Sequence, residues 1–474
     1  MKKAGRSARV HGPMSWRRLF PFVFLFTCID GFISNWLYPA VLPLLYRDFL
    51  IIGVYGFFIA QEPVEQWATQ LRKRVGPDAW LFAMSFVVLG LLQVFNPLSA
   101  DVLVGLLGLK ILLLYWPLAV LGYAYVDSLE RARGLLKAIV FFSVPINLFG
   151  LYQFWRGPEF LVSTFGPGFE RATILAFIEG VAADDSFLRI PGTFASTGQF
   201  SSFLLIDAMF CFGLLFSARE KRERMILIGC AVLNFVTLLA TGSRGAFVVL
   251  VMQSGVFALL CRRARQAVGV ALLVGLSLYY GFNWLGDSVI SRFESLRDME
   301  MIRERTVDTT SGMFVDVFNE YPFGRGLGTA SLATRHLLGE DSTGWAMVEN
   351  YLTKLQMETG ILGVLLFYLF MGILSFRWLN WLKPLEGPAR NLVMSLAAYY
   401  ITLFLVSGLF GGLDTPPQSV FLWPLIGIGA RLSVLPYEIR QKTFAYHRPL
   451  RSYSDSGTLV GMRSKDSTDG TDSL

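Results

Sequence analysis

Apolar runs long enough to cross a lipid bilayer recur along most of this chain, and they constrain its fold more than any other feature. A helix needs about 20 apolar residues to cross a hydrocarbon core of roughly 30 Å. Of the 474 residues, 54% are hydrophobic and only 16% are charged, whereas ordinary soluble domains carry about 25% charged residues. These values exclude a soluble globular enzyme. They predict an all-α fold, a polytopic bundle of membrane helices.

Polar breaks divide the apolar runs into about twelve predicted transmembrane helices. These helices are expected near residues 19–35, 42–60, 79–95, 101–125, 135–154, 198–217, 225–241, 245–261, 267–285, 349–375, 391–410 and 418–434. No internal repeat is visible in the sequence. Its absence weakens the hypothesis of a transporter built from inverted repeats.

Lys and Arg residues indicate the orientation of the chain, because the cytoplasmic connections of membrane proteins are rich in them. Every second predicted connection is basic, and the basic connections contain Arg72, Lys73 and Arg74; Arg131 and Arg133; Arg219, Lys221, Arg222 and Arg224; Arg262, Arg263 and Arg265; Arg377, Lys383 and Arg390. Both termini are therefore predicted to be cytoplasmic. The net charge of +7 is explained by this bias, so it gives no reason to expect a nucleic-acid partner.

The pattern predicts a cytoplasmic N-terminus at 1–18, a membrane domain at 19–434 and a cytoplasmic tail at 435–474. The tail is expected to be largely disordered, because it is rich in Ser, Asp and Gly and lacks apolar periodicity. Two longer segments, about 156–199 and 287–348, fall on the predicted outer side. The second is long enough to form a small folded cap rather than a slack loop.

A turn on the predicted outer side is a candidate anion site. The sequence Thr241-Gly-Ser-Arg-Gly245 separates two apolar runs, and its glycines allow a sharp turn that exposes N–H groups beside Arg244. Such a turn is a natural cradle for an anion, with Ser243 as a second candidate contact. The alternative is that Arg244 only reaches toward lipid headgroups.

Both outer segments are rich in arginine, although the outer side of a membrane protein normally is not. The first ends in Arg189-Ile-Pro-Gly-Thr-Phe194, and small polar residues follow that either contact a ligand or only cap the next helix. The second contains Arg303, Arg305 and Arg325, the last in the Gly-rich turn Tyr321–Gly328. A ligand that carries phosphate would explain these cations. The alternative is pairing with Asp and Glu residues of the same segment.

Acidic and basic residues also mark the start of the tenth predicted helix. Glu349 and Asn350 open it, where a carboxylate is favourable because of the helix dipole. Lys354 and Glu358 follow with i, i+4 spacing, and we expect this pair to serve the structure. Capping alone is the alternative explanation for Glu349.

Common catalytic motifs are missing. The chain contains no Asp-x-Asp, Walker, His-Glu-x-x-His or Gly-x-Ser-x-Gly sequence. This argues against metal-dependent transfer from nucleotide sugars and against the use of ATP. No metal ion and no cofactor are expected.

Four motifs in a fixed order resemble the O-antigen ligase and polysaccharide polymerase family over roughly residues 80–430. They are Arg189–Phe194, Leu238–Ala246, Tyr321–Gly328 and Val348–Gly363. The resemblance implies a glycosyltransferase in the bacterial inner membrane, which takes a glycan from a polyprenyl diphosphate on the outer side and attaches it to an acceptor hydroxyl. The implied partners are the polyprenyl-diphosphate-linked oligosaccharide, membrane lipids, a chain-length regulator and polysaccharide export proteins.

One departure bears on the acceptor, because ligases of this family usually carry His-Asn where this chain has Glu349-Asn350. The departure favours a polymerase of exopolysaccharide or O-antigen over a ligase. The expected catalytic residues are Glu349 as the general base and Arg244 and Arg305 at the diphosphate. The expected substrate-binding residues are Arg189, Arg303, Arg325, Asn350 and Ser243.

Three alternatives stay open at this point. An O-antigen ligase and a protein O-oligosaccharyltransferase would use the same donor with another acceptor. A transporter or flippase of lipid-linked sugars would need buried charges at mid-span. The charges of this sequence are expected at the outer mouth, with Lys110 as the main exception inside a predicted span, and this argues against transport.

Overall fold

The computed structural model describes residues 15–37, 46–99, 101–157, 159–169, 189–294, 303, 311–331, 350–408 and 412–436. The chain divides into a unit Met1–Leu435, which contains every helix named below, and a unit Pro436–Leu474, of which only Pro436 is described. No β-strand occurs in the described ranges. The predicted all-α fold is confirmed, and the tail prediction lies outside the described residues.

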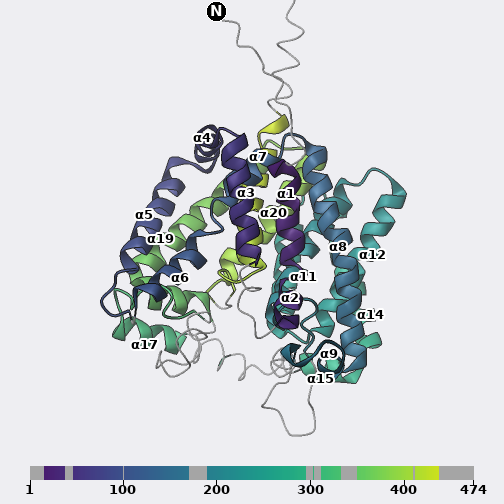
Figure 1. Cartoon of the computed structure of the whole chain (residues 1–474). Helices are drawn as coiled ribbons and strands as arrows, with labels where there is room; N and C mark the ends of the chain where they lie inside the picture. Colours follow the sequence, from purple (N-terminus) through teal and green to yellow (C-terminus); the bar gives the residue numbers. More distant parts are fainter. Residues whose placement is uncertain are drawn as a thin grey trace, which may run out of the picture. The chain divides into compact units, whose positions relative to one another are not determined.

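The N-terminal half of the membrane unit is a series of helices joined by short connections (Figure 1). They are α1 (Trp16–Thr27), α2 (Asp30–Trp36), α3 (Tyr46–Gln61), α4 (Val64–Val75), α5 (Pro77–Gln93), α6 (Val102–Leu113), α7 (Leu118–Tyr125), α8 (Leu129–Arg156), α9 (Glu159–Phe165) and the 3-10 helix η2 (Pro167–Phe169). The sequence analysis did not predict α4, which is polar and ends in basic residues. Helix α8 begins earlier than predicted because the Ser128 hydroxyl accepts the N–H of Arg131 at 3.2 Å and caps a polar first turn.

The C-terminal half of the membrane unit contains α19, the longest helix of the described residues. The elements of this half are α11 (Thr197–Ser217), α12 (Lys221–Ala240), α13 (Arg244–Leu260), α14 (Ala264–Leu285), α15 (Asp287–Glu294), α17 (Gly312–Glu320), α19 (Tyr351–Leu382), α20 (Gly387–Val406) and α21 (Gln418–Leu432). Helices α15 and α17 belong to the predicted outer segment 287–348, and α17 packs against α19. The described part of that segment is therefore folded rather than extended.

By length and composition, seven helical stretches in the described residues are able to cross a membrane, and one of them, Val102–Tyr125, joins α6 and α7. The number rises to nine if two bent pairs are each counted as one span: α1 with α2, which meet at 63°, and α4 with α5, which meet at 114°. Helix α13 is apolar but shorter. Each predicted apolar run contains helix in the described residues, and the multi-pass membrane fold is confirmed. The number of twelve crossings stays a prediction.

The basic connections gather at one end of the bundle. Figure 1 shows α4 and α7 at this end and α9, α15 and α17 at the opposite end. Hydrogen bonds join the basic connections to one another and to the starts of neighbouring helices: Arg133 to Glu223 (3.1 Å), Arg262 to the carbonyl of Lys383 (2.7 Å) and Arg377 to Asp78 (2.7 Å). This separation of charge agrees with the alternation seen in the sequence. The side that faces the cytoplasm stays a prediction.

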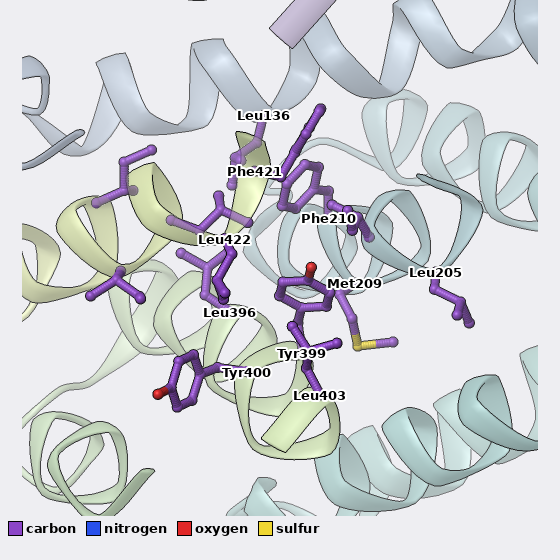
Figure 2. Close-up of a cluster of buried hydrophobic side chains, with 14 of the residues drawn as sticks. Leu136, Leu205, Met209, Phe210, Leu396, Tyr399, Tyr400, Leu403, Phe421 and Leu422 are labelled. Atoms are coloured by element: carbon purple, nitrogen blue, oxygen red, sulfur yellow. The ribbon is translucent and has the colours of Figure 1, made fainter. Parts of the chain in front are cut away.

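Helix α11 is the centre of the bundle. In its most apolar window 89% of the residues are buried, against 28% for α14, so α11 is enclosed by protein while α14 presents most of its surface outward. Figure 2 shows the packing of α11, α20 and α21 through Leu205, Met209, Phe210, Tyr399, Leu403 and Phe421. Burial of such large apolar side chains fixes the positions of α11 and α20, which carry part of the site described below.

Charged side chains inside the bundle compensate one another. Lys110 of α6 forms an ion pair with Asp48 of α3, and Arg47 pairs with Asp30. The Tyr115 hydroxyl donates to Asp48 at 3.2 Å. Pairing removes most of the cost of placing charges at membrane depth. The prediction that Lys110 was the main exception is therefore wrong, because Arg47 and Asp48 are also buried in a predicted span.

Asp207 is a further buried acid that the sequence analysis overlooked. It is fully buried in α11, and its Oδ2 accepts hydrogen bonds from Ser143 of α8 at 2.7 Å and Asn234 of α12 at 2.9 Å. Polar groups that bond across helices hold membrane bundles together. Asp207 thus ties α8 and α12 to the central helix.

Candidate functional site

The turn between α12 and α13 forms one wall of the candidate site. Thr241 ends α12, Gly242 has a positive φ of 61°, and Ser243 caps α13 by accepting the N–H of Ala246 at 3.4 Å. The Ser201 hydroxyl of α11 donates to the Thr241 hydroxyl at 3.3 Å and fixes the turn to the central helix. The sharp turn expected from the sequence is confirmed.

Arg244 is the first residue of α13 and is half-buried. The N-terminus of a helix carries a partial positive charge and unsatisfied N–H groups, so a cation at this position is electrostatically unfavourable. An anion beside the turn offsets this repulsion, because it is attracted both to the helix N-terminus and to the guanidinium. The position of Arg244 is thus suited to a negatively charged ligand.

The segment that leads into α11 is fixed by two neighbouring helices. The Gln153 side chain of α8 clamps Gly192 through two hydrogen bonds of 2.9 and 3.0 Å. The backbone N–H of Phe32 in α2 donates to the Thr193 carbonyl at 2.7 Å. Ser196 then caps α11. Ser196 is thus the predicted cap, while a ligand contact of the neighbouring small polar residues stays a prediction; half-buried Arg189 lies at the start of this fixed segment.

A cavity of about 180 Å³ lies beside the Arg244 turn. It is lined by the start of α11, the first three turns of α13, the end of α20, Leu413 and the first residue of α21. Its polar lining comes from Ser201, Ser202, Ser243, Gln253, Ser407 and Gln418. Ser243 therefore joins the predicted anion turn to a polar hollow within the protein.

The Gly-rich turn Tyr321–Gly328 inserts into a break in α19. Gly360 interrupts this helix with a φ of 70°, and the N–H of Ile361 donates to the Pro322 carbonyl at 3.0 Å. The N–H of Arg325 donates to the Met357 carbonyl at 2.7 Å. In a continuous helix Ile361 and Met357 would bond to each other. The turn thus satisfies both backbone groups that the break leaves open.

Close backbone packing explains the glycines of this turn. A Cβ atom at Gly324 would lie 2.7 Å from the backbone N of Gly360, and one at Gly328 would lie 2.3 Å from the Val104 carbonyl oxygen. The turn is therefore wedged between α19 and α6. The side chain of Arg325 lies over the Tyr321 ring, 5.7 Å from its centroid, and its contact with a ligand stays a prediction.

A buried charge cluster lies below the start of α19. Lys354 forms an ion pair with Asp414, and its Nζ lies 3.9 Å from Oε1 of Glu358, which confirms the predicted i, i+4 pair. The same oxygen accepts the N–H of Ala330 at 3.3 Å. All three charged side chains are at most 13% exposed. The cluster connects α19 to the loop between α20 and α21.

The remaining predicted site residues differ in how much the structure says of them. Arg303 is helical and exposed. Asn350 is buried, and its Oδ1 accepts the N–H of Thr353 at 2.7 Å, so it is the N-cap of α19. The predictions for Arg305 and Glu349 lie outside the described residues. A substrate contact of Asn350 stays a prediction.

Several polar residues of the site were missed in the sequence. Asp414 lies in the short connection before α21, which contains no Lys or Arg, and Gln418 is the first residue of α21. Gln253 and Ser407 lie within apolar helices, where they carry no motif. A buried amide in a membrane helix is itself a signal, because polar side chains there need a partner or a function.

Comparison with known proteins supplies the remaining observation. Residues 229–368 match the family model described as O-antigen ligase. The matched range contains Ser243, Arg244, the Tyr321–Gly328 turn and the first half of α19. The resemblance is thereby confirmed for this range, which contains three of the four motifs, while Arg189–Phe194 lies outside it. The chain has no match among curated proteins.

Proposed function

Because residues 229–368 match the O-antigen ligase family, we propose that this multi-pass membrane protein is a polysaccharide polymerase. It transfers a glycan from a polyprenyl-diphosphate donor to a sugar hydroxyl on the outer side of the inner membrane. The observation that carries the proposal is the position of Arg244 at the N-terminus of α13, within the matched range and beside a polar cavity. This position suits the diphosphate that leaves during transfer.

The proposed reaction is a single displacement that needs no metal ion. The acceptor hydroxyl oxygen attacks the anomeric carbon of the donor sugar, the bond from that carbon to the diphosphate breaks, and the anomeric centre inverts. Arg244 and Arg305 stabilise the negative charge of the departing diphosphate, and Arg189, Arg303 and Arg325 are the further proposed contacts of the substrate. Arginine suits this role because its planar fork matches phosphate oxygens and stays charged. A preorganised donor of this kind contributes about 2.7–4 kcal/mol.

Glu349 is the proposed general base that takes the proton of the acceptor hydroxyl. It precedes Asn350, the N-cap of α19, so the helix N-terminus favours its ionised form. A positioned base contributes about 10²- to 10⁴-fold to the rate. The presence of Glu rather than His at this position supports a polymerase over a ligase.

The proposal is tested with the purified protein in liposomes, supplied with a lipid-diphosphate oligosaccharide. A chelator removes metal ions, and no nucleotide sugar is added. A ladder of products that grows by one oligosaccharide at a time supports a polymerase. A single transfer to a lipid or protein acceptor supports a ligase or an oligosaccharyltransferase. Movement of the lipid across the bilayer without transfer supports a flippase and overturns the proposal.

A further inference from the structure

The cavity of about 180 Å³ beside the Arg244 turn is lined by polar but uncharged side chains. Serine hydroxyls and glutamine amides each donate and accept hydrogen bonds. Apolar surface is added by Leu205, Ala246, Val249, Leu403, Val406 and Leu413. Among the described residues that line it, none is charged. This composition suits a neutral ligand that carries both hydroxyl groups and C–H surface.

Two glutamines of the lining have an unsatisfied oxygen. Gln253 of α13 is 1% exposed and Gln418 of α21 is 7% exposed. In the part of the chain that the structure describes, neither Oε1 accepts a hydrogen bond. A buried acceptor without a donor is unfavourable by about 1–3 kcal/mol. A hydroxyl group placed in the cavity would remove this penalty, because the terminal amide of glutamine turns easily about χ3.

The size of the cavity matches a single sugar ring. Sites for drug-sized molecules occupy about 300–1,000 Å³, so a cavity of about 180 Å³ is too small for an oligosaccharide. A single pyranose presents hydroxyl groups at its rim and C–H groups on its faces. The remaining sugars of a longer glycan would have to lie outside the cavity.

Ser243 connects the cavity to the proposed diphosphate site, because it lines the cavity and directly precedes Arg244. A sugar in the cavity would therefore lie next to the diphosphate. We infer that the cavity binds the first sugar of the lipid-linked donor, that this sugar is an uncharged hexose, and that Gln253 and Gln418 select it. The inference rests on the proposed function. A uronic acid at this place would bring an unpaired charge into a neutral cavity.

The test measures binding of two lipids to the purified protein in liposomes: undecaprenyl diphosphate that carries a single uncharged hexose, and undecaprenyl diphosphate without sugar. The wild type is expected to bind the hexose-bearing lipid about tenfold more tightly. Gln253→Leu and Gln418→Leu should each reduce this preference about three- to tenfold, the effect of losing one hydrogen bond. Neither substitution should change binding of the sugar-free lipid.

Two further variants keep the inference falsifiable if the leucine variants do not fold. Ala246→Leu fills the cavity from α13 and should remove the preference while all polar groups remain. Ser254→Ala is the control, since Ser254 is a buried residue of the same helix that does not line the cavity, and it should leave binding unchanged. A third lipid that carries glucuronic acid should bind less tightly than the hexose-bearing lipid.

The outcomes separate this inference from the proposed function. Equal binding of the hexose-bearing and sugar-free lipids by the wild type overturns the inference, and it leaves the diphosphate site intact. An unchanged preference in folded Ala246→Leu overturns it as well. Two results together overturn the proposed function at its diphosphate site. The wild type does not bind the sugar-free lipid, and Arg244→Ala does not weaken the binding of either lipid.

Discussion

Lys354 of α19 and Asp414 of the loop after α20 form a buried ion pair although they lie 60 residues apart in the chain. The loop that carries Asp414 contacts two sites. Asp414 belongs to the charge cluster, while Leu413 and the nearby first residue of α21, Gln418, line the neutral cavity. The ion pair therefore fixes a wall of the proposed sugar site as well as the start of α19.

Removal of the cation from this cluster should be more damaging than removal of one acid. Lys354→Met leaves Glu358 and Asp414 together without a cation and should lower the free energy of unfolding by about 3–5 kcal/mol. Asp414→Asn keeps the Lys354–Glu358 pair and should have a smaller effect. Thermal unfolding in detergent measures both. Lys383→Met is the control, because Lys383 is an exposed lysine at the other end of α19, and equal losses from all three variants would contradict the predicted role.

The break in α19 should not tolerate a side chain. Alanine at Gly360 would have to adopt a φ of 70°, and its Cβ would lie 2.4 Å from the carbonyl carbon of Phe323. With a ψ of −177°, this backbone conformation is essentially restricted to glycine and is unfavourable for alanine by about 1–3 kcal/mol, and displacement of the inserted turn adds to this. Gly360→Ala should therefore lower the unfolding temperature by several degrees.

Gly255→Ala provides the matched comparison for Gly360→Ala. A Cβ atom at Gly255 in α13 would meet no atom within 4 Å. Alanine is favoured over glycine inside a helix, so this variant should be neutral or slightly stabilising. Equal unfolding temperatures for the two variants would show that the break can rearrange.

Labelling of introduced cysteines tests the topology. Asn319 is exposed on α17 and Lys221 is exposed at the start of α12, near the opposite end. A membrane-impermeant maleimide added to intact cells should label Asn319→Cys and spare Lys221→Cys until the membrane is opened. Cys28, Cys211 and Cys230 are buried, so only Cys261 has to be replaced in the background. The reverse pattern would invert the proposed orientation.

The sequence was sufficient to predict the apolar helices, since each apolar run is a local property of the chain. The caps at Ser196 and Asn350 and the Lys354–Glu358 pair are also local. Contacts between distant segments were not predictable in this way. Asp414 stands in a short connection that gives no sign of Lys354.

The glycines also show that contacts between distant segments cannot be predicted from local sequence. The glycines of Tyr321–Gly328 indicated a turn, but close contact with Gly360 depends on the packing of α19. Helix α4 was missed for a different reason, since its polar sequence lacks the apolar run by which the other helices were recognised. Distant packing, rather than local pattern, is therefore what the structure adds to the site.

Substitution of the proposed diphosphate contacts should abolish transfer and leave the protein folded. Arg244→Ala and Arg305→Ala each remove a fixed cation worth about 2.7–4 kcal/mol in the transition state, a rate loss of roughly 10²- to 10³-fold. Arg244→Lys should restore only part of the activity, because an ammonium group does not replace a bidentate fork. Polymer formation in liposomes measures the effect.

Arg222→Ala is the control for these variants. Arg222 is exposed near the start of α12, at the end of the bundle that carries the basic connections. Its loss should leave polymer formation unchanged. Normal polymer from Arg244→Ala would reduce this residue to a contact with lipid headgroups.

Glu349 is expected to accept the proton of the acceptor hydroxyl, and Glu349→Gln should separate binding from chemistry. The substitution keeps the size of the side chain but removes its basicity. The cations proposed around the diphosphate hold Glu349 ionised and also weaken it as a base, so it can act only in direct contact with the hydroxyl. The variant should bind the lipid-linked donor normally and elongate it about 10²- to 10⁴-fold more slowly. Single-turnover assays with preloaded donor measure this difference.

Glu358→Gln is the matched comparison, because Glu358 is a buried glutamate of α19 that contacts Lys354 and the N–H of Ala330. Loss of its charge should lower the unfolding temperature and leave the turnover of the folded protein close to that of the wild type. Equal turnover losses in the two variants would indicate that both act through the stability of α19. If Glu349→Gln elongates at the normal rate, the base must be another group, and His336 and Asp308 of the same outer segment would be substituted next.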